Sequence, residues 1–489
     1  MPEIPDADRS DATPSRTASG KRGPSPHHRV VIVGAGFGGM NAARALDGTD
    51  AEVVLIDRTN HNLFQPLLYQ VATAALAGND IALPIRSIFR RQRNVTVVMD
   101  TLSSIDRASR ELHFESGASL GYDTLVLATG SVYSWFGHDD WKQNSTGLKT
   151  LAEADFLRNR LLDAFEKAEL ATDPAEIRAL LTFVLIGAGP TGVELAGALA
   201  ELSRLTLVRD FRHIHPADAR IVLCDAGPRV LASFPPRLSA YAARRLQALG
   251  VELLLNTPVK DVRADDVTAG DKVIAARTVF WAAGTQATPV ASWLGVKPAR
   301  QGLTEVEPDC TLPGHPEIFV IGDAASCKGR DGKQLPGLAS VAKQQGIYVG
   351  GLIAARLGHG PLAERKRPVW KRPVWKRRLG GRPAPRSTGD AAPLPFQYRD
   401  YGQLAMIGRS SAVADFGWIC LTGYPAWVLW SAVHLLLLVS VRNRLVVYVN
   451  WAWAWLTYAR GARVITGEPD LEFDTTAGAG HATTSGATP

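Results

Sequence analysis

The hydrophobic residues of this chain gather in short runs, and each run is followed by small residues and then by a helix-forming segment. The runs at 30–33 and 181–186 begin two such units, and in each unit a later run ends in an aspartate. Apolar runs rich in β-branched residues and separated by helical segments are typical of buried parallel strands. The pattern predicts an α/β protein that contains two similar strand–turn–helix–strand units.

The turn of the first unit is rich in glycine. Gly34, Gly36 and Gly39 form a GxGxxG pattern, and the following strand ends at Asp57. In a nucleotide-binding fold these glycines make a tight turn, let the backbone approach a pyrophosphate and allow close packing of helix on strand. The helix then offers N–H groups to the phosphates, and the acid meets a ribose hydroxyl. We expect a dinucleotide here; a glycine-rich loop that binds nothing is the alternative.

The same pattern recurs in the second unit. Gly187, Gly189 and Gly192 lead into a helix, and a later strand ends at Asp225. The stretch between them is longer than usual, which makes Asp225 the less certain assignment. An acid at this strand end favours NADH over NADPH, because a 2′-phosphate would meet a carboxylate. Arg229 lies nearby in the sequence and could soften that preference, although a solvated surface arginine is the simpler interpretation.

Three further strands end in small residues or a short acid. Their ends carry Thr129, Gly130, Gly284, Gly322 and Asp323. Small residues let the backbone pass close to a cofactor, and a short acid can bond a ribityl hydroxyl. In isolation such strings are usually plain strand ends, but their order along this chain is much more specific.

These strings resemble those of the flavoproteins with two dinucleotide-binding domains, and most closely those of type II NADH dehydrogenases, the single-subunit respiratory NADH:quinone oxidoreductases. The matching strings include NHNLFQPLLYQVATAAL, YDTLVLATGSVYSWFG, GAGPTGVELAGALAEL, VIGDAA, ASVAKQQG and YGQLAMIGRSSAV. The resemblance implies two Rossmann-like domains, with FAD at the first turn and NADH as substrate at the second. It also implies hydride transfer from NADH to FAD and then two-electron reduction of a quinone, without proton pumping.

The resemblance also divides the chain. The expected parts are a disordered tail at 1–27, an FAD-binding domain at 28–150 and 290–355, an NADH-binding domain at 151–289, a basic linker at 356–394, a membrane-anchoring domain at 395–465, and a disordered tail at 466–489.

The segment 60–76 contains no cysteine, whereas disulfide reductases of this superfamily carry a redox-active pair here. The acceptor must then meet the flavin directly or by one-electron transfer. An apolar wall with a few polar groups suits a quinone headgroup. The wall would come from Phe64, Pro66, Leu67 and Leu68, with Gln65 or Gln70 as hydrogen-bond partners. The alternative is a helix start packed in the core.

The resemblance points to four further residues. The family pattern AQxAxQ places two glutamines by the quinone and flavin; Ser340 replaces the first here, and Gln344 matches the second. Lys343 could help to hold an anionic reduced flavin, although a solvated lysine is the simpler interpretation. Glu194 matches a glutamate near the nicotinamide and flavin rings. We also expect it in the first turn of its helix, where the helix dipole alone would favour an acid.

The C-terminal part is apolar. Residues 417–441 include no Asp, Glu, Lys or Arg, and a shorter tryptophan-rich run follows at 445–459. The first run is long enough to be a transmembrane candidate, although Gly423 and Pro425 weaken that interpretation. Tryptophans and bordering arginines suit a membrane surface. We expect two helices lying in one leaflet at the cytoplasmic face; a single span or a buried homodimer surface are the alternatives.

Composition narrows the partners. The net charge of +7 is local, because ten Lys or Arg residues stand against one Glu between residues 364 and 386, where KRPVW occurs twice. A broad basic face for nucleic acid is therefore not indicated, and contact of this linker with anionic lipid is one interpretation. The four cysteines have no CxxC spacing, and no metal-ligand cluster is evident.

Two other functions remain open at this stage. A sulfide:quinone oxidoreductase would share the fold but needs redox cysteines near the flavin, and Cys310 and Cys327 do not match the expected positions. A flavin-bearing redox sensor without turnover is the non-enzymatic alternative. The sequence does not indicate which quinone is used, whether NADPH is tolerated, or the oligomeric state.

Overall fold

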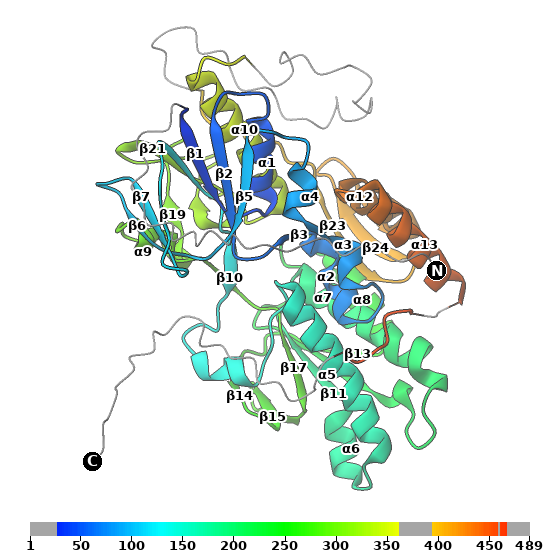
Figure 1. Cartoon of the computed structure of the whole chain (residues 1–489). Coiled ribbons are helices and arrows are strands. Elements are labelled where there is room, and N and C mark those ends of the chain that lie inside the picture. Colours follow the sequence, from blue (N-terminus) through cyan, green and yellow to red (C-terminus); the bar gives the residue numbers. More distant parts are fainter. Residues whose placement is uncertain (1–26, 361–393, 458–459, 467–489) are drawn as a thin grey trace, which may run out of the picture. The chain divides into compact units, whose positions relative to one another are not determined.

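The computed structural model describes residues 27–360, 394–457 and 460–466 of the chain (Figure 1). These residues form two compact units. Unit 1 comprises Met1–Asn62, Pro84–Val132 and Gln286–Asp400, and unit 2 comprises Leu63–Leu83, Tyr133–Thr285 and Tyr401–Pro489. The predicted tails and the basic linker with its KRPVW repeat lie outside the described residues, apart from a few positions at their edges.

Unit 1 is built on a six-stranded sheet in the order β20-β21-β9-β1-β2-β5. Its strands are β1 (Arg29–Val33), β2 (Glu52–Asp57), β5 (Val95–Met99), β9 (Thr124–Leu127), β20 (Thr311–Leu312) and β21 (His315–Val320). The pairs among β5, β2, β1, β9 and β21 are all parallel. The sheet is covered on both faces, which explains why β1 and β2 read as unbroken apolar runs.

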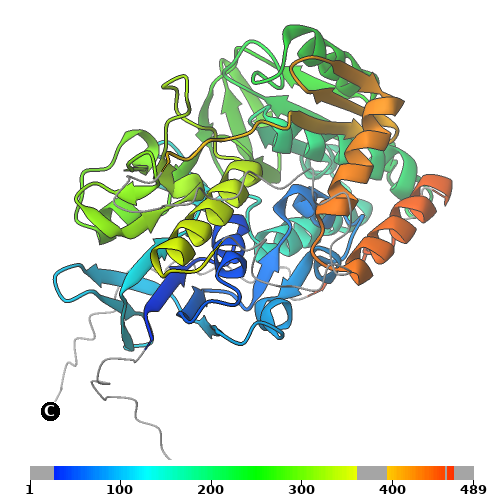
Figure 2. The ribbon, with the colours of Figure 1, turned by 90° about the horizontal axis from the view of Figure 1, so that it is seen from above.

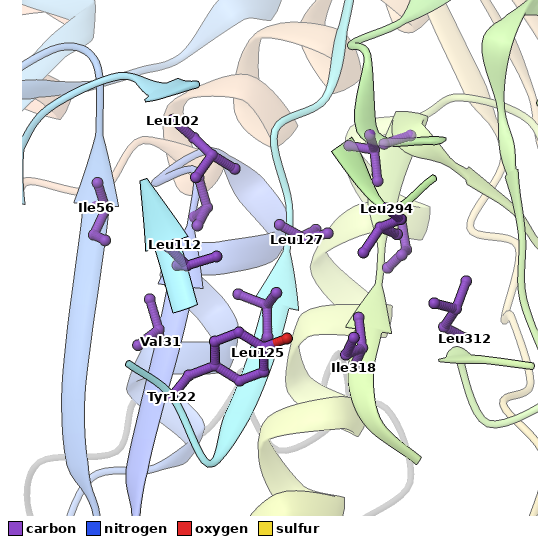
Figure 3. Close-up of a cluster of buried hydrophobic side chains, with 14 of the residues drawn as sticks. Val31, Ile56, Leu102, Leu112, Tyr122, Leu125, Leu127, Leu294, Leu312 and Ile318 are labelled. Atoms are coloured by element: carbon purple, nitrogen blue, oxygen red, sulfur yellow. The ribbon is translucent and has the colours of Figure 1, made fainter. Parts of the chain in front are cut away.

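One face of this sheet carries α1 (Phe37–Ala45) and α10 (Ala339–Arg356), which lie side by side in Figures 1 and 2. They approach closely, since a Cβ at Gly346 of α10 would lie 2.1 Å from the carbonyl oxygen of Gly38. The other face carries the meander β6 (Leu102–Asp106), β7 (Glu111–Phe114) and β8 (Ser119–Gly121). Figure 3 shows Leu102 and Leu112 beside side chains of the sheet in this buried cluster.

The remaining elements of unit 1 are short. They are α4 (Ile85–Phe89), α9 (Val290–Trp293), η6 (Arg300–Gly302), β19 (Thr304–Glu305), η7 (Gly322–Ala324) and β22 (Ala325–Ser326). Four further short strands stand where the chain passes between the units: β3 (His61–Leu63), β4 (Ala82–Pro84), β10 (Ser131–Tyr133) and β18 (Thr285–Ala287).

Unit 2 repeats the arrangement on a four-stranded parallel sheet in the order β13-β12-β11-β17. Its strands are β11 (Thr182–Ile186), β12 (Arg220–Cys224), β13 (Val251–Leu254) and β17 (Thr278–Trp281), and its crossover helices are α7 (Pro190–Glu201) and α8 (Pro236–Ala248). An antiparallel sheet follows β13: β14 (Val259–Val262), β15 (Asp266–Ala269) and β16 (Lys272–Ala275).

Two other groups of elements complete unit 2. The first is helical: η1 (Gln65–Leu67), α2 (Leu68–Ala72), α3 (Gly78–Ile81), η2 (Asp139–Gln143), α5 (Leu151–Leu170), α6 (Pro174–Leu180), the π-helix η3 (Leu202–Thr206), η4 (Leu207–Arg209) and η5 (Pro216–Asp218). The second is C-terminal: β23 (Gln403–Gly408), β24 (Ser411–Asp415), β25 (Cys420–Gly423), α12 (Tyr424–Leu437) and α13 (Val441–Thr457). β23 packs so closely on α7 that a Cβ at Gly197 would lie 1.7 Å from the carbonyl oxygen of Ile407.

The predicted fold class is confirmed, since each unit holds a mainly parallel sheet with a glycine turn and a helix after its first strand. The two compact units are not the predicted dinucleotide-binding domains, and those domain bounds stay a prediction. The apolar run 417–441 is not one continuous helix: β25 ends at Gly423, where φ is +73°, and α12 begins at Tyr424 with Pro425 in its first turn. Proline suits that position because the first N–H groups of a helix have no partner within it.

Candidate functional site

The glycine turn of unit 1 joins β1 to α1. Gly34 has a φ of +100°, and a Cβ there would lie 2.4 Å from the carbonyl oxygen of Ala128. A Cβ at Gly39 would lie 1.8 Å from the carbonyl oxygen of Gly34. Any side chain at either position would therefore force the backbone apart. A Cβ at Gly36 would instead meet open space, which leaves room for a phosphate against the backbone.

The start of α1 and the end of β2 face this turn. None of the described side chains caps α1, so the positive end of its dipole is directed at the turn. Asp57 Oδ2 accepts a hydrogen bond of 2.7 Å from the backbone N–H of Ala35, and its Oδ1 accepts from the backbone and hydroxyl of Thr59. Oδ2 retains a lone pair that a ribose hydroxyl could use.

The ends of β1 and β9 mark the point where the strand order of unit 1 reverses. From β1 the chain continues outward to β2 and β5, and β9 lies on its other side. Ligands of such sheets bind in the crevice at this point. Gly130 follows β9 with a φ of +75° and accepts from the N–H of Thr288 at 3.2 Å. The hydroxyl of Thr129 lies 2.6 Å from that of Thr288, so the predicted Thr129–Gly130 pair borders the crevice.

The predicted Gly322–Asp323 pair lies at the end of β21 in the same unit. The N–H of Gly322 donates to Gln345 Oε1 on α10 at 2.7 Å, and Ser131 Oγ donates to Asp323 Oδ2 at 2.8 Å. A cradle without side chains, an uncapped helix and two carboxylates at these strand ends fit the pyrophosphate, ribose and ribityl groups of FAD.

The glycine turn of unit 2 has nearly the same geometry. Gly187 has a φ of +106°, and a Cβ there would lie 2.7 Å from the carbonyl carbon of Ala282. A Cβ at Gly192 would lie 1.9 Å from the carbonyl oxygen of Gly187, while one at Gly189 would meet open space. None of the described side chains caps α7 either. The turn therefore offers a second pyrophosphate cradle, as the sequence predicts.

Asp225 ends β12 and braces this second turn. Its Oδ2 accepts from the N–H of Ala188 and its Oδ1 from the N–H of Gly227, both at 2.6 Å. The arrangement matches that of Asp57, which supports the assignment that the long sequence spacing left uncertain. Arg229 donates to the carbonyl oxygens of Ala232 and Phe234. This arginine therefore holds its own loop.

Gln344 and Ser340 on α10 both contact the segment at 394–400. The Gln344 amide donates to the carbonyl oxygen of Arg399 at 2.9 Å and accepts from its N–H at 3.0 Å. Ser340 Oγ lies 2.9 Å from the hydroxyl of Tyr398. Lys343 on the same helix is half-buried. In this structure the two residues predicted to face the quinone therefore hold the segment 394–400 against α10.

Glu194 lies deeper in unit 2 than the sequence predicts. α7 begins at Pro190, so Glu194 is its fifth residue and not in the first turn, and the helix-dipole explanation is wrong. Its Oε1 accepts from the N–H of Met406 at 3.1 Å. Burial raises the pKa of Glu194 to about 8, which leaves the carboxyl group mostly protonated at neutral pH.

The segment after Leu63 is packed in the core of unit 2. Phe64, Leu67 and Leu68 are buried, whereas Gln65 is exposed and donates to the carbonyl oxygen of Lys149 at 3.1 Å. Of the residues predicted to meet the quinone, Gln70 lines a cavity.

That cavity has a volume of about 100 Å³ and is enclosed by α2, α7, β23, α12 and α13, all within unit 2. Its lining includes Tyr69, Gln70, Met406, Trp430 and Trp451. The Gln70 amide donates to the hydroxyl of Tyr69 at 3.0 Å and accepts from the indole N–H of Trp451 at 2.7 Å. From the sequence, the tryptophans were expected at a membrane surface. Their position around Gln70 could not be predicted, because it depends on contacts between residues some 380 positions apart.

An ion pair closes one side of the cavity. Arg460 lies 3.5 Å from Glu201 on α7 and donates to the carbonyl oxygen of Thr73 at 2.8 Å. Glu201 also accepts from the N–H of Arg409. Burial raises the pKa of Glu201, and the charge of Arg460 opposes that rise. Sequence reasoning missed this pair, which joins the end of the C-terminal segment to the dinucleotide-binding helix.

The outer faces of α12 and α13 are apolar and exposed. Asn443 and Val447 form the buried stripe of α13, and Asn443 donates to backbone carbonyls of Asn79 and Asp80. The exposed residues of the two helices and their approach are Trp418, Tyr424, Val428, Leu436, Leu437, Val441, Leu445, Tyr448, Val449, Trp453, Trp455 and Leu456. Among the described residues no helix combines the length and hydropathy that a membrane span requires. Figure 2 shows α12 and α13 side by side.

Comparison with known families gives consistent matches over nearly the whole chain. Residues 28–346 match the pyridine nucleotide-disulphide oxidoreductase family, and residues 401–458 match the NDH2 C-terminal domain. A type II NADH:quinone oxidoreductase of Mycobacterium tuberculosis is 39% identical over 455 residues, which cover 91% of each chain. An internal alternative NAD(P)H-ubiquinone oxidoreductase of Arabidopsis thaliana is 28% identical and covers 88% of this chain and 84% of its own.

Solved structures agree at the level of the fold. The NDH2 of Plasmodium falciparum in complex with NADH superposes with a TM-score of 0.76 at 20% identity, covering 89% of this chain and 99% of that one. A sulfide:quinone oxidoreductase of Aquifex aeolicus superposes with a TM-score of 0.62 at 18% identity, covering 85% and 92%. The sequence relatives, and not these distant folds, separate the two activities.

Proposed function

We propose that this chain, which belongs to the type II NADH:quinone oxidoreductases of the pyridine nucleotide-disulphide oxidoreductase family, oxidises NADH and reduces a quinone, with FAD as its cofactor. The observation that carries the proposal is the pair of matched glycine cradles in a chain 39% identical to such an enzyme over 91% of its length. FAD, when bound, accepts the hydride of NADH and passes two electrons to the acceptor.

Unit 1 supplies the residues that would hold FAD. The backbone at Gly36 and the start of α1 would bind the pyrophosphate, and Asp57 would accept from a ribose hydroxyl. Asp323, fixed by Ser131, would accept from a ribityl hydroxyl. Thr129 and Gly130 would border the same crevice, since both follow the central strand β9.

Unit 2 supplies the NADH site in the same way. The backbone at Gly189 and the start of α7 would bind the pyrophosphate, and Asp225 would accept from the adenosine ribose. A carboxylate there disfavours the 2′-phosphate of NADPH. Burial raises the pKa of Glu194 to about 8, so its mostly protonated carboxyl group can donate a hydrogen bond as well as accept one. We propose that it acts near the nicotinamide, and Glu194→Gln should slow reduction of the bound flavin by NADH more than it weakens NADH binding. An unchanged stopped-flow rate would contradict this role.

For the quinone we propose the tryptophan-lined cavity of unit 2 as a binding site. Its wall is apolar, and Gln70 and Tyr69 present a hydrogen-bonded polar pair to it. Such a combination suits a ring with two carbonyl oxygens and an apolar tail. Gln344, Ser340 and Lys343, all on α10 of unit 1, remain candidates for contact with the flavin.

We further propose that α12 and α13 lie on a lipid surface. Exposed apolar residues follow one face of α13 at helical spacing, from Val441 through Leu445 and Val449 to Leu456. Val449→Glu together with Leu456→Glu should lower the bound fraction in vesicle sedimentation, whereas the control Gln247→Glu together with Ala248→Glu, at exposed positions of α8, should not. Equal sedimentation would contradict a lipid role, and a change in oligomeric state instead would assign this face to a homodimer. The cytoplasmic side of the membrane remains a sequence-based expectation.

The test of the function is steady-state NADH oxidation by the FAD-loaded protein with and without a menaquinone or ubiquinone analogue. We expect turnover that depends on quinone and exceeds the rate with oxygen. Gln70→Leu should raise the KM for quinone, because the Gln70 amide is proposed to contact the quinone. The rate of flavin reduction by NADH should stay unchanged, because that step precedes the reaction with quinone. Flavin that NADH reduces but that no quinone reoxidises would refute the proposed acceptor.

A further inference from the structure

An unusual turn lies beside β17 in unit 2. The N–H of His138 donates to the carbonyl oxygen of Trp135 at 3.0 Å, and the two residues between them, Phe136 and Gly137, have φ values of +53° and +95°. A tight turn with positive φ at both central positions favours Asn-Gly. A bulky aromatic residue in the first of these positions is strained. The sequence therefore keeps a phenylalanine where the backbone disfavours it.

The strain does not serve the hydrophobic core. The side chain of Phe136 is 64% exposed, although it is a large apolar group. Its ring lies directly over Gly284, because a Cβ at Gly284 would come within 2.3 Å of the ring carbon Cζ. Gly284 has a φ of +68°, so both partners of this contact adopt conformations that few residues tolerate.

The position of the ring is fixed from behind. The indole N–H of the buried Trp281 donates to the carbonyl oxygen of Ser134 at 3.0 Å, and the N–H of Ser134 donates to that of Gly284 at 3.4 Å. Trp135 stacks on Trp281 with ring centroids 6.0 Å apart, and the Phe136 ring tilts against the same indole at 6.2 Å. One face of the phenylalanine remains open to solvent while the loop beneath it is anchored.

The open ring lies at the place where this sheet binds its ligand. In the order β13-β12-β11-β17 the chain runs outward from β11 to β12 and β13, and β17 lies on the other side of β11. The strand order therefore reverses between β11 and β17, and ligands bind in the crevice beyond their carboxyl ends. Gly187 directly follows β11, and its backbone lies close to that of Ala282, which directly follows β17. Gly284, with Phe136 over it, is two residues further along that rim.

Asp225 follows β12, and α7 is uncapped. A dinucleotide held by these two groups would have its adenosine ribose and pyrophosphate on one side of the crevice. The other half of the dinucleotide must then extend across β11 toward β17. We propose that Phe136 is a substrate-contacting residue that packs its exposed ring against the nicotinamide half of NADH. The inference rests on the proposed function, since it takes the unit 2 cradle as the NADH site.

The experiment compares Phe136→Asn with Phe136→Tyr in the FAD-loaded full-length protein. Asparagine suits positive φ and removes the ring, whereas tyrosine keeps the ring and the strain. We expect the dissociation constant of NAD⁺, measured by equilibrium titration, and the KM for NADH to rise about three- to tenfold in Phe136→Asn, the range for one aromatic stacking contact. Its Tm should equal or exceed that of the wild type, and Phe136→Tyr should bind as the wild type does.

Wild-type affinity for NAD⁺ in Phe136→Asn would overturn the proposal. A lower Tm with unchanged affinity would do the same, because it would show a ring that only packs. The titration needs no turnover, so it separates this proposal from the proposed function. Weaker NAD⁺ binding in Phe136→Asn would support the contact even if no quinone reoxidised the enzyme.

Discussion

Substitution of Glu194 by Gln tests whether the core of unit 2 holds a neutral carboxylic acid. The folded-state pKa of about 8 stands against an ordinary value of 4.5, and burial is the main cause. The folded protein therefore binds this proton more tightly than the unfolded chain does. Stability from the neutral acid is complete below about pH 4.5 and is lost as the pH rises to about 8.

The size of the effect follows from the two pKa values. One pKa unit corresponds to about 1.4 kcal/mol, so the full difference is about 5 kcal/mol above pH 8. The carboxyl group lies deep among the atoms of unit 2, but part of the residue's surface remains accessible, so we halve this figure. Glutamine keeps the acceptor for the N–H of Met406 and never ionises. Glu194→Gln should therefore be more stable than the wild type by about 2 kcal/mol at pH 8.5, with little difference at pH 4.5.

The assay is chemical denaturation of both proteins at pH 4.5, 6, 7.5 and 8.5. Glu201→Gln provides the matched control, since it removes a carboxylate two turns along the same helix. That variant should be destabilised at pH 7.5 and 8.5, because Arg460 would remain buried without its partner. A stability difference for Glu194→Gln that does not change with pH would refute the raised pKa. Equal behaviour of the two variants would refute the assignment of distinct environments to the two glutamates.

Three further predictions address other parts of the chain. Burial lowers the pKa of His434 to about 4, so the wild type should lose stability as the pH falls from 6.5 to 4, and His434→Phe should flatten that limb of a Tm-against-pH curve. Gly39→Ala should abolish FAD retention and lower the Tm of the apoprotein, whereas Gly36→Ala should weaken FAD binding alone, as fluorescence titration and calorimetry would show. Gln344→Ala should destabilise the folded protein by about 2 kcal/mol through its two lost backbone bonds, and an unchanged Tm would contradict that anchoring.

The glycine turns could be predicted because their requirements are local. At Gly39 a side chain would collide with the backbone of Gly34 in the same strand–turn–helix segment. At Gly34 it would collide with the backbone of Ala128, which follows the adjacent strand. The aspartates at the strand ends follow from the same short pattern. The family membership and the activity that the motifs implied are confirmed by the relatives, since the matches extend over nearly the whole chain.

The environment of Glu194 could not be predicted in this way. Its neutral state depends on burial, and the contacts that bury it, such as that with Met406, come from residues more than 200 positions later in the chain. The residue pattern of α7 does not indicate those contacts. The sequence placed Glu194 in the first turn of the helix and so suggested an effect of the helix dipole instead. Gln344 shows the same limit, because its amide meets the backbone of Arg399 across a segment whose composition carries no signal of that contact.

The two anchors on α10 also have a consequence for how this gene can change. The chain leaves α10 after Arg356. It returns to the helix at Leu394, whose carbonyl oxygen accepts from the hydroxyl of Tyr348 at 2.5 Å, and at Arg399, which is hydrogen-bonded to Gln344. Exit and return lie on one rigid rod, eight residues or about 12 Å apart. Because both ends are fixed to the same helix, an insertion between them would leave the distance that the chain must span unchanged. We therefore expect changes of length to be tolerated at this place more readily than within either parallel sheet.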